Sequence, residues 1–222
     1  MNAGFLKRAM SSLIDLIIVF SLIAMTFFLF GRSIIRNQIP DFDEIFTAYN
    51  EVVDAYNSDL EIITTEYTAA LEIADGDETL EAAAQEVYST KKAMLDAQNI
   101  VDIEPFNNPL TGYFLNSIYY FAIGFLILMA IYTLATGSKT FGRKVMQVKL
   151  SGPVNPISIF FHDIVFKYFF TVLVFSVSIY AGVVLFLLSL AIDLILVSFT
   201  KSKNTLRDIF LKMSIEKTGY GY

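Results

Sequence analysis

Residues 157–199 read ISIFFHDIVFKYFFTVLVFSVSIYAGVVLFLLSLAIDLILVSF, an apolar run of 43 residues. One helix of that length would span roughly 64 Å, about twice the ~30 Å hydrocarbon core of a bilayer. The run therefore predicts two membrane-spanning helices joined by a tight turn. Glycine suits tight turns, so we place the turn at Tyr180-Ala181-Gly182 and the helices at 158–178 and 182–199.

Two further stretches are long and apolar enough to cross a membrane. The first covers residues 13–30, follows a basic Lys7-Arg8 pair and ends in LFGR. It lacks the small residues of a signal-peptide cleavage site, so we interpret it as a retained spanning helix. The second covers residues 113–136 and has three tyrosines near its start, where interface anchors are expected.

Charge is distributed very unevenly along the chain. Residues 38–105 hold 17 of the 22 acidic residues and only two bases, Lys91 and Lys92. The remainder holds 14 bases and five acids, so an acidic insert interrupts a basic membrane body. There is no cysteine and only one histidine, His162, which excludes disulfides, thiolate chemistry and histidine-rich zinc sites. We therefore expect no metal and no cofactor.

The positive-inside rule gives an orientation. With four spans, residues 1–12, 137–156 and 200–222 share one side of the membrane and hold 11 of the 16 Lys and Arg residues. The opposite side holds four, and cytoplasmic loops carry the excess of these bases. We therefore expect a multi-pass protein of the cell membrane with both termini in the cytoplasm.

The expected fold is an all-α membrane protein, a four-helix transmembrane bundle with an extracytoplasmic helical, coiled-coil-like hairpin. The segments expected in order are a first transmembrane helix with a cytoplasmic N-terminus at 1–36, the acidic hairpin at 37–110, the second transmembrane helix at 111–136, a basic amphipathic cytoplasmic loop at 137–156, the third and fourth transmembrane helices at 157–200, and a basic cytoplasmic tail at 201–222.

The insert has a helical repeat. Apolar residues recur at steps of three and four, the seam of a coiled coil, and Asp75-Gly76-Asp77 then breaks the pattern before a weaker second helix that Asn107-Asn108-Pro109 would end. We expect this seam either to bind another protein or a second copy of the chain, or to pack within the hairpin itself. The candidate partner-binding residues are Phe42, Ile45, Tyr49, Val52, Tyr56, Leu60, Ile63 and Tyr67.

Ionisable residues inside a membrane are costly and indicate function. Asp15, Lys167 and Asp193 each lie about two helical turns from the predicted cytoplasmic edge of their helices. Arg8 precedes Asp15 by seven residues, so the two share a helix face. We expect Lys167 to pair with Asp15 or Asp193, and Arg8 to pair with either. The cluster is then either a polar clasp or a site for Na⁺ or H⁺.

Secondary candidates lie nearer the membrane edge or beyond it. They are His162, Asp163 and Asp208. The loop 139–150 alternates bases with apolar residues and predicts an amphipathic piece lying on the inner leaflet. Thr205 and Asp208 are expected to cap a short C-terminal helix.

Three segments resemble the RDD family of bacterial membrane proteins, named for an Arg and two Asp residues. They are KRAMSSLID at 7–15, SKTFGRKVMQVK at 138–149 and NTLRDIF at 204–210. The resemblance covers 7–36 and 111–217. It implies that Arg8 and Asp15 are signature residues, that the second aspartate is Asp193 or Asp208, and that transport such as sodium–proton exchange is one activity.

This chain also departs from the family pattern. Lys167 stands where the family usually has Arg, the closing His is missing, and the long acidic insert is additional.

Two functions follow. The first is a regulatory or assembly subunit of a membrane complex, acting through the hairpin on a membrane or extracytoplasmic protein. The alternative is a small cation or proton transporter that uses the intramembrane Asp residues. We expect no enzyme, because the nucleophile-elbow, zinc-protease, phosphate-loop and dinucleotide motifs are absent from the sequence, and nothing in it favours nucleic-acid binding.

Overall fold

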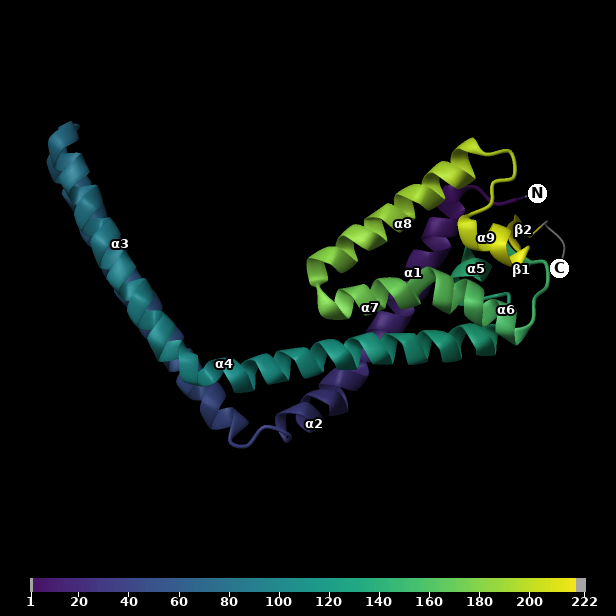
Figure 1. The fold of residues 1–222 in the computed structure, drawn as a ribbon, viewed down its shortest axis with the longest axis horizontal. Coiled ribbons are helices and arrows are strands. Elements are labelled where there is room, and N and C mark those ends of the chain that lie inside the picture. Colours follow the sequence, from purple (N-terminus) through teal and green to yellow (C-terminus); the bar gives the residue numbers. More distant parts are fainter. Residues whose placement is uncertain (1, 219–222) are drawn as a thin grey trace. The chain divides into compact units, whose positions relative to one another are not determined.

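A computed structural model describes residues 2–218 (Figure 1). The chain forms two compact units, a membrane unit of residues up to 33 and from 116 onward, and a hairpin unit of residues 34–115. The elements in order are α1 Phe5–Thr26, the π-helical η1 Phe27–Gly31, α2 Arg32–Arg36, α3 Phe42–Ala74, α4 Glu78–Thr136, α5 Phe141–Val145, β1 Val148–Ser151, α6 Pro156–Phe160, the π-helical η2 Phe161–Phe169, α7 Phe170–Val177, α8 Ile179–Phe199, α9 Leu206–Leu211 and β2 Ser214–Lys217.

Four helical segments are long and apolar enough to cross a membrane. They are Phe5–Arg36, Glu78–Thr136, Pro156–Val177 and Ile179–Phe199, with a mean hydropathy between 1.7 and 2.6 over their most apolar windows. This confirms the predicted number of spans and the division of residues 157–199 into two helices. The length and apolar composition of these four helices indicate a helical membrane protein.

The turn between the last two spans lies at Ser178 and not at Tyr180-Ala181-Gly182. Ser178 is extended (φ −149°, ψ 115°), and its hydroxyl accepts a hydrogen bond from the Ala181 amide at 3.3 Å. Gly182 lies inside α8, where a Cβ would come within 2.5 Å of Phe175 Cα. Gly182 therefore allows α7 and α8 to pack closely, and a serine N-cap makes the turn.

The hairpin turn is where the sequence predicted it. Asp75 (φ 47°) and Gly76 (φ 86°) adopt left-handed backbone between α3 and α4, and the Asp77 carboxylate accepts from the Thr79 amide at 2.9 Å. The helix that follows does not end at Asn107-Asn108-Pro109. α4 continues through Pro105 and Pro109 to Thr136, so the second hairpin helix and the second span are one helix. Each proline removes one backbone donor but leaves the rest of the ladder in place.

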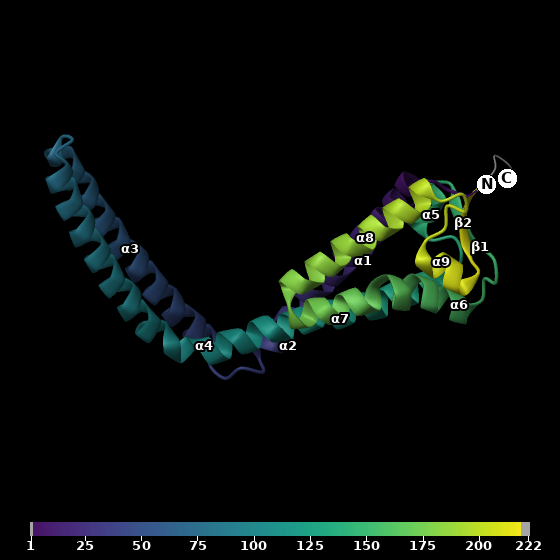
Figure 2. The ribbon, with the colours of Figure 1, turned by 45° about the horizontal axis from the view of Figure 1, so that its top comes forward.

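A small sheet forms part of the membrane unit and departs from the all-α expectation. β1 pairs antiparallel with β2, Val148 opposite Lys217, and Asn2 bridges to Glu216 (Figure 2). Val148 and Leu150 are buried against Ala3 near the N-terminus, Ile159 of α6, and Met213 and Ile215 near the C-terminus. Residues 139–150 thus contain a short helix and the start of a buried strand. The prediction that this segment lies on the inner leaflet is wrong for Val148 and Leu150, which are buried in the protein.

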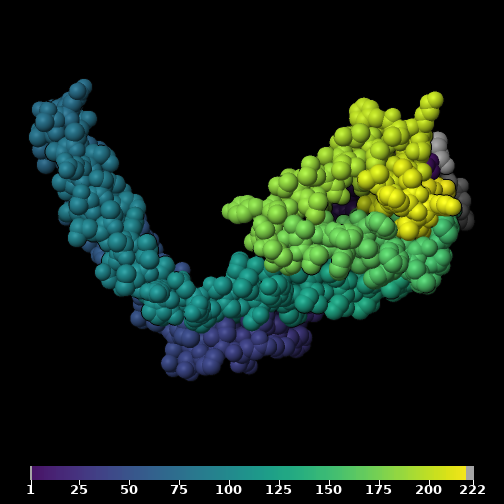
Figure 3. All heavy atoms as spheres, in the orientation of Figure 1, coloured from purple at the N-terminus to yellow at the C-terminus, as the bar shows by residue number. Residues whose placement is uncertain are grey.

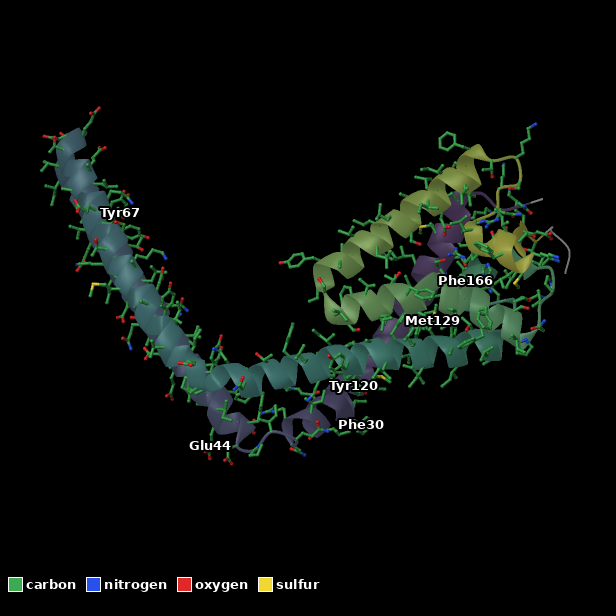
Figure 4. The ribbon with its side chains drawn as sticks, viewed as in Figure 1. Phe30, Glu44, Tyr67, Tyr120, Met129 and Phe166 are labelled. Atoms are coloured by element: carbon green, nitrogen blue, oxygen red, sulfur yellow. The ribbon has the colours of Figure 1, made fainter. Side chains whose placement is uncertain are left out.

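The helical core of the membrane unit lies between α1, α4 and η2. Val19 and Ile23 of α1 are fully buried, and they contact Phe125 and Met129 of α4 (Figure 4 labels Met129). Tyr168 of η2 completes the cluster, its ring edge-on to Phe125 at 5.2 Å between centroids. This core packs α1, α4 and η2 against one another. Two of these helices carry ionisable residues of the predicted site, Arg8 and Asp15 in α1 and Lys167 in η2.

Candidate functional site

Five buried side chains form one continuous chain of ionic contacts. Arg8 Nη1 donates to Asp208 Oδ2 at 2.5 Å, and Asp208 Oδ1 lies 2.7 Å from His162 Nε2. His162 Nδ1 lies 2.7 Å from Asp163 Oδ1, and Arg143 Nη2 donates to both oxygens of Asp163 at 2.6 and 2.7 Å. All five are at most 5% exposed. Charged groups this deeply buried persist only when each has a partner.

Local structure holds Asp208 in place. Thr205 and Asp208 form a capping box on α9, with the Thr205 amide donating to Asp208 Oδ2 at 3.0 Å, as the sequence predicted. Burial by itself would raise the pKa of the Asp208 carboxyl, but the hydrogen bond and charge of His162 and the charge of Arg8 outweigh it. The pKa lies well below its ordinary value. Asp208 is therefore an anion that the protein stabilises.

His162 bridges two carboxylates through its two ring nitrogens. His162 contacts Asp163 Oδ1 through Nδ1 and Asp208 Oδ1 through Nε2, both at 2.7 Å. It joins η2 to α9, while Arg8 joins α9 to α1 and Arg143 joins α5 to η2, so the chain of contacts ties four elements together.

Asp15 is held by neutral donors. Tyr132 Oη donates to Oδ1 at 2.6 Å, the Gly142 amide donates to Oδ1 at 2.8 Å, and Thr140 Oγ1 donates to Oδ2 at 2.7 Å. A Cβ on Gly142 would lie 2.0 Å from the Ser11 carbonyl oxygen and 2.9 Å from Asp15 Oδ1. Only glycine permits this approach of α5 to α1.

The predicted pairing of these charges is wrong in detail. Lys167 Nζ donates to Ser12 Oγ at 2.7 Å and lies 4.8 Å from the centre of the Tyr168 ring, and it pairs with neither Asp15 nor Asp193. Asp193 pairs with Arg207 at 3.0 Å. Arg8 pairs with Asp208 because the chain beyond α8 folds back so that α9 contacts the start of α1. Helix periodicity does not predict this contact.

One cavity of about 340 Å³ nevertheless brings the predicted residues together. Arg8, Asp15, Lys167 and Asp193 all line it, as do His162 and Asp163. In Figure 3 a hollow lies between α8 and the C-terminal segment, with purple atoms of the N-terminal helix visible inside it. The predicted site residues did not include the partners of Asp15, Asp163 and Asp193, which are Tyr132, Thr140, Gly142, Arg143 and Arg207. The TFGR segment of the family resemblance was the signal that pointed to three of them.

The predicted partner-binding seam faces α4 within the hairpin. Tyr56 Oη donates to Asp96 Oδ1 at 2.7 Å, and Tyr67 stacks on Tyr88 at 4.7 Å between ring centroids. Each of the remaining seam residues is buried or half-buried: Phe42, Ile45, Tyr49, Val52, Leu60 and Ile63. The seam therefore packs within the hairpin, which is the second of the two arrangements expected from the sequence.

A row of apolar residues beside the α3-facing seam of α4 is exposed, and two of its members, Leu80 and Val87, also line a groove with Ile63 and Ala70 of α3. Leu80, Val87, Met94 and Val101 follow one another at intervals of seven residues and are between 51% and 70% exposed. Beside them, three and four residues apart, lie small exposed side chains: Ala83, Thr90 and Ala97. We call these seven residues the outer face of α4.

Comparisons of the chain with protein-family models, curated proteins and solved structures found no match.

Proposed function

We propose that this protein is an assembly or regulatory subunit of a membrane complex, and that the outer face of α4 docks a basic helix of its partner. The observation that carries the proposal is the heptad spacing of four exposed apolar residues on a helix whose other apolar seam is already occupied. Large residues at one heptad position with small residues at another form the surface into which a second helix packs.

Charge complementarity selects the partner. The insert at 38–105 holds 17 acids against two bases. A second copy of the hairpin would bring an equal excess of negative charge to the interface, which opposes self-association. An amphipathic helix with Lys or Arg beside its apolar seam is attracted instead, so the occupant we propose is a basic coiled-coil helix.

The test uses the full-length protein in nanodiscs of zwitterionic lipid, with empty nanodiscs as the blank. The probes are two synthetic heptad peptides that differ only in carrying Lys or Glu beside a leucine seam. We expect the Lys peptide to bind, with an affinity that falls as salt rises, and the Glu peptide not to bind. The double substitution Val87→Glu and Met94→Glu should weaken binding by at least about tenfold, because it puts charge into the apolar seam.

The matched control adds acidic charge to the same helix away from the outer face. Ser89→Glu changes an exposed residue between the two substituted positions and should leave the affinity of the Lys peptide unchanged. Equal weakening by Ser89→Glu and by the double substitution would show that charge alone attracts the peptide. That result, or dimerisation of the protein through this face, would refute the proposed docking surface.

Cation transport receives less support from the geometry. A transported Na⁺ or proton needs a carboxylate that is free to exchange its partner. Asp15 accepts three hydrogen bonds, and Asp193 is paired with Arg207. We therefore favour the subunit function over the transport function.

We also propose membership of the RDD family, with Asp208 as the second signature aspartate. The three segments that resemble the family meet at one place, since Arg8 of the first contacts Asp208 of the third, and Asp15 accepts from Thr140 and Gly142 of the second. The termini are cytoplasmic in this proposal and the hairpin lies outside, because 11 of the 16 bases lie on the side of the termini.

A further inference from the structure

Several hydrogen-bond donors around the membrane-unit cavity have no acceptor. Arg143 Nη1, the Tyr168 hydroxyl and Arg207 Nε are buried and unpartnered within residues 2–218. Arg143 and Tyr168 are each only 5% exposed. Lys167 adds an amino group with several N–H donors, and its one hydrogen bond within residues 2–218 goes to Ser12. All four side chains line the same cavity.

The acceptors in the cavity wall are already engaged. Asp163 is held by Arg143 and His162, Asp15 by three neutral donors, and Asp193 by Arg207. Four basic side chains line the cavity: Arg8, which is paired with Asp208, and Arg143, Lys167 and Arg207. The three carboxylates therefore leave Arg143 Nη1, the Tyr168 hydroxyl and Arg207 Nε without an acceptor among residues 2–218.

We propose that the cavity binds a phosphate group, which meets the unpartnered donors of Arg143, Lys167, Tyr168 and Arg207. A phosphate has several acceptor oxygens and negative charge, and both Arg and Lys are phosphate-binding residues. A cavity of about 340 Å³ has room for it. The phosphate comes from an anionic lipid headgroup or from free phosphate. This binding site is separate from the docking surface on α4, and neither proposal depends on the other.

Tyr168→Phe is the sharpest test, because it removes one unpartnered hydroxyl and leaves the ring in place. The ligand-free variant should unfold at the same temperature as the wild type or a higher one, since a buried hydroxyl without a partner is unfavourable. Its affinity for phosphate should fall by about tenfold, the loss expected for one hydrogen bond to a charged group. Lys167→Gln should weaken binding further. Lys144→Gln, an exposed base beside Arg143, should leave it unchanged.

The measurement is the thermal midpoint of the full-length protein in neutral detergent, followed by circular dichroism at constant ionic strength. The probes are inorganic phosphate and short-chain phosphatidylglycerol below its micellar concentration, with sodium chloride as the reference. A ligand that binds only the folded state raises the midpoint. A rise with phosphatidylglycerol alone assigns the site to lipid, and a rise with inorganic phosphate assigns it to the free anion. No rise with either probe, or equal rises in wild type and Tyr168→Phe, would overturn the proposal.

Discussion

Gly142→Ala is expected to destabilise the membrane unit by about 4 kcal/mol or more, a loss large enough to prevent recovery of folded protein. The added Cβ would lie 2.0 Å from the Ser11 carbonyl oxygen, a backbone atom in the middle of α1. The clash cannot be relieved by rotating a side chain, so α5 must move away from α1. That movement also breaks the hydrogen bond from the Gly142 amide to Asp15.

Thermal unfolding in mild detergent measures this effect, and Gly124→Ala is its matched control. Gly124 lies inside α4, and its nearest neighbour to an added Cβ is Ile23 at 3.8 Å, an ordinary contact. Alanine in a helix interior is more favourable than glycine, so this variant should be as stable as the wild type or more stable. A Gly142→Ala protein with the wild-type midpoint would show that α5 does not pack on α1 as described.

Asp208→Asn should cost about 3–5 kcal/mol, the usual effect of removing one partner from a buried ion pair. The substitution affects two contacts at once, because Asp208 accepts from Arg8 and faces His162. It leaves Arg8 buried without a compensating anion and removes one of the two carboxylates that contact His162. Asp193→Asn is the control. Within residues 2–218 Asp193 has a single ion pair, with Arg207, and its side chain is 18% exposed, so the loss should be smaller.

The stability that Asp208 contributes should also depend on pH. Its pKa in the folded protein lies below its ordinary value, so the contribution is fully present above the pKa of aspartate in the unfolded chain, about 4. It is lost as the pH falls below that value toward the folded pKa. The difference in midpoint between wild type and Asp208→Asn should therefore be constant near neutral pH and shrink below about pH 4. A difference that grows on acidification would contradict the ionised assignment of Asp208.

Much of the fold was predictable because it depends on local patterns. Apolar length sets the spans, the Asp75-Gly76 pair sets the hairpin turn, and Thr205 with Asp208 sets the start of α9. The continuous α4 was not predictable from Pro105 and Pro109, because a helix tolerates the loss of single donors when its other bonds are kept. Likewise, the sequence predicts a turn at Gly182, whereas in the structure this glycine allows close contact with Phe175.

The site was predictable in its residue types but not in its pairing. Spacing placed Arg8 and Asp15 on one face of α1, and both line the cavity. Their partners, Asp208 and Thr140, come from short segments that only the tertiary fold brings near α1. His162 and Lys167 lie in the nine-residue π-helix η2, whose spacing differs from that of an α-helix. The directions of their side chains, and hence their partners, could therefore not be predicted from α-helical periodicity.

We propose that four helices cross the membrane and place the hairpin on the side opposite the termini. The sequence has no cysteine, so single cysteines at Gly76, Ser178, Lys144 and Lys201 can be probed with a membrane-impermeant maleimide on intact cells. We expect positions 76 and 178 to be labelled, and positions 144 and 201 only after the cells are permeabilised. Labelling of position 178 together with 201, or protection of position 76 in intact cells, would contradict the account.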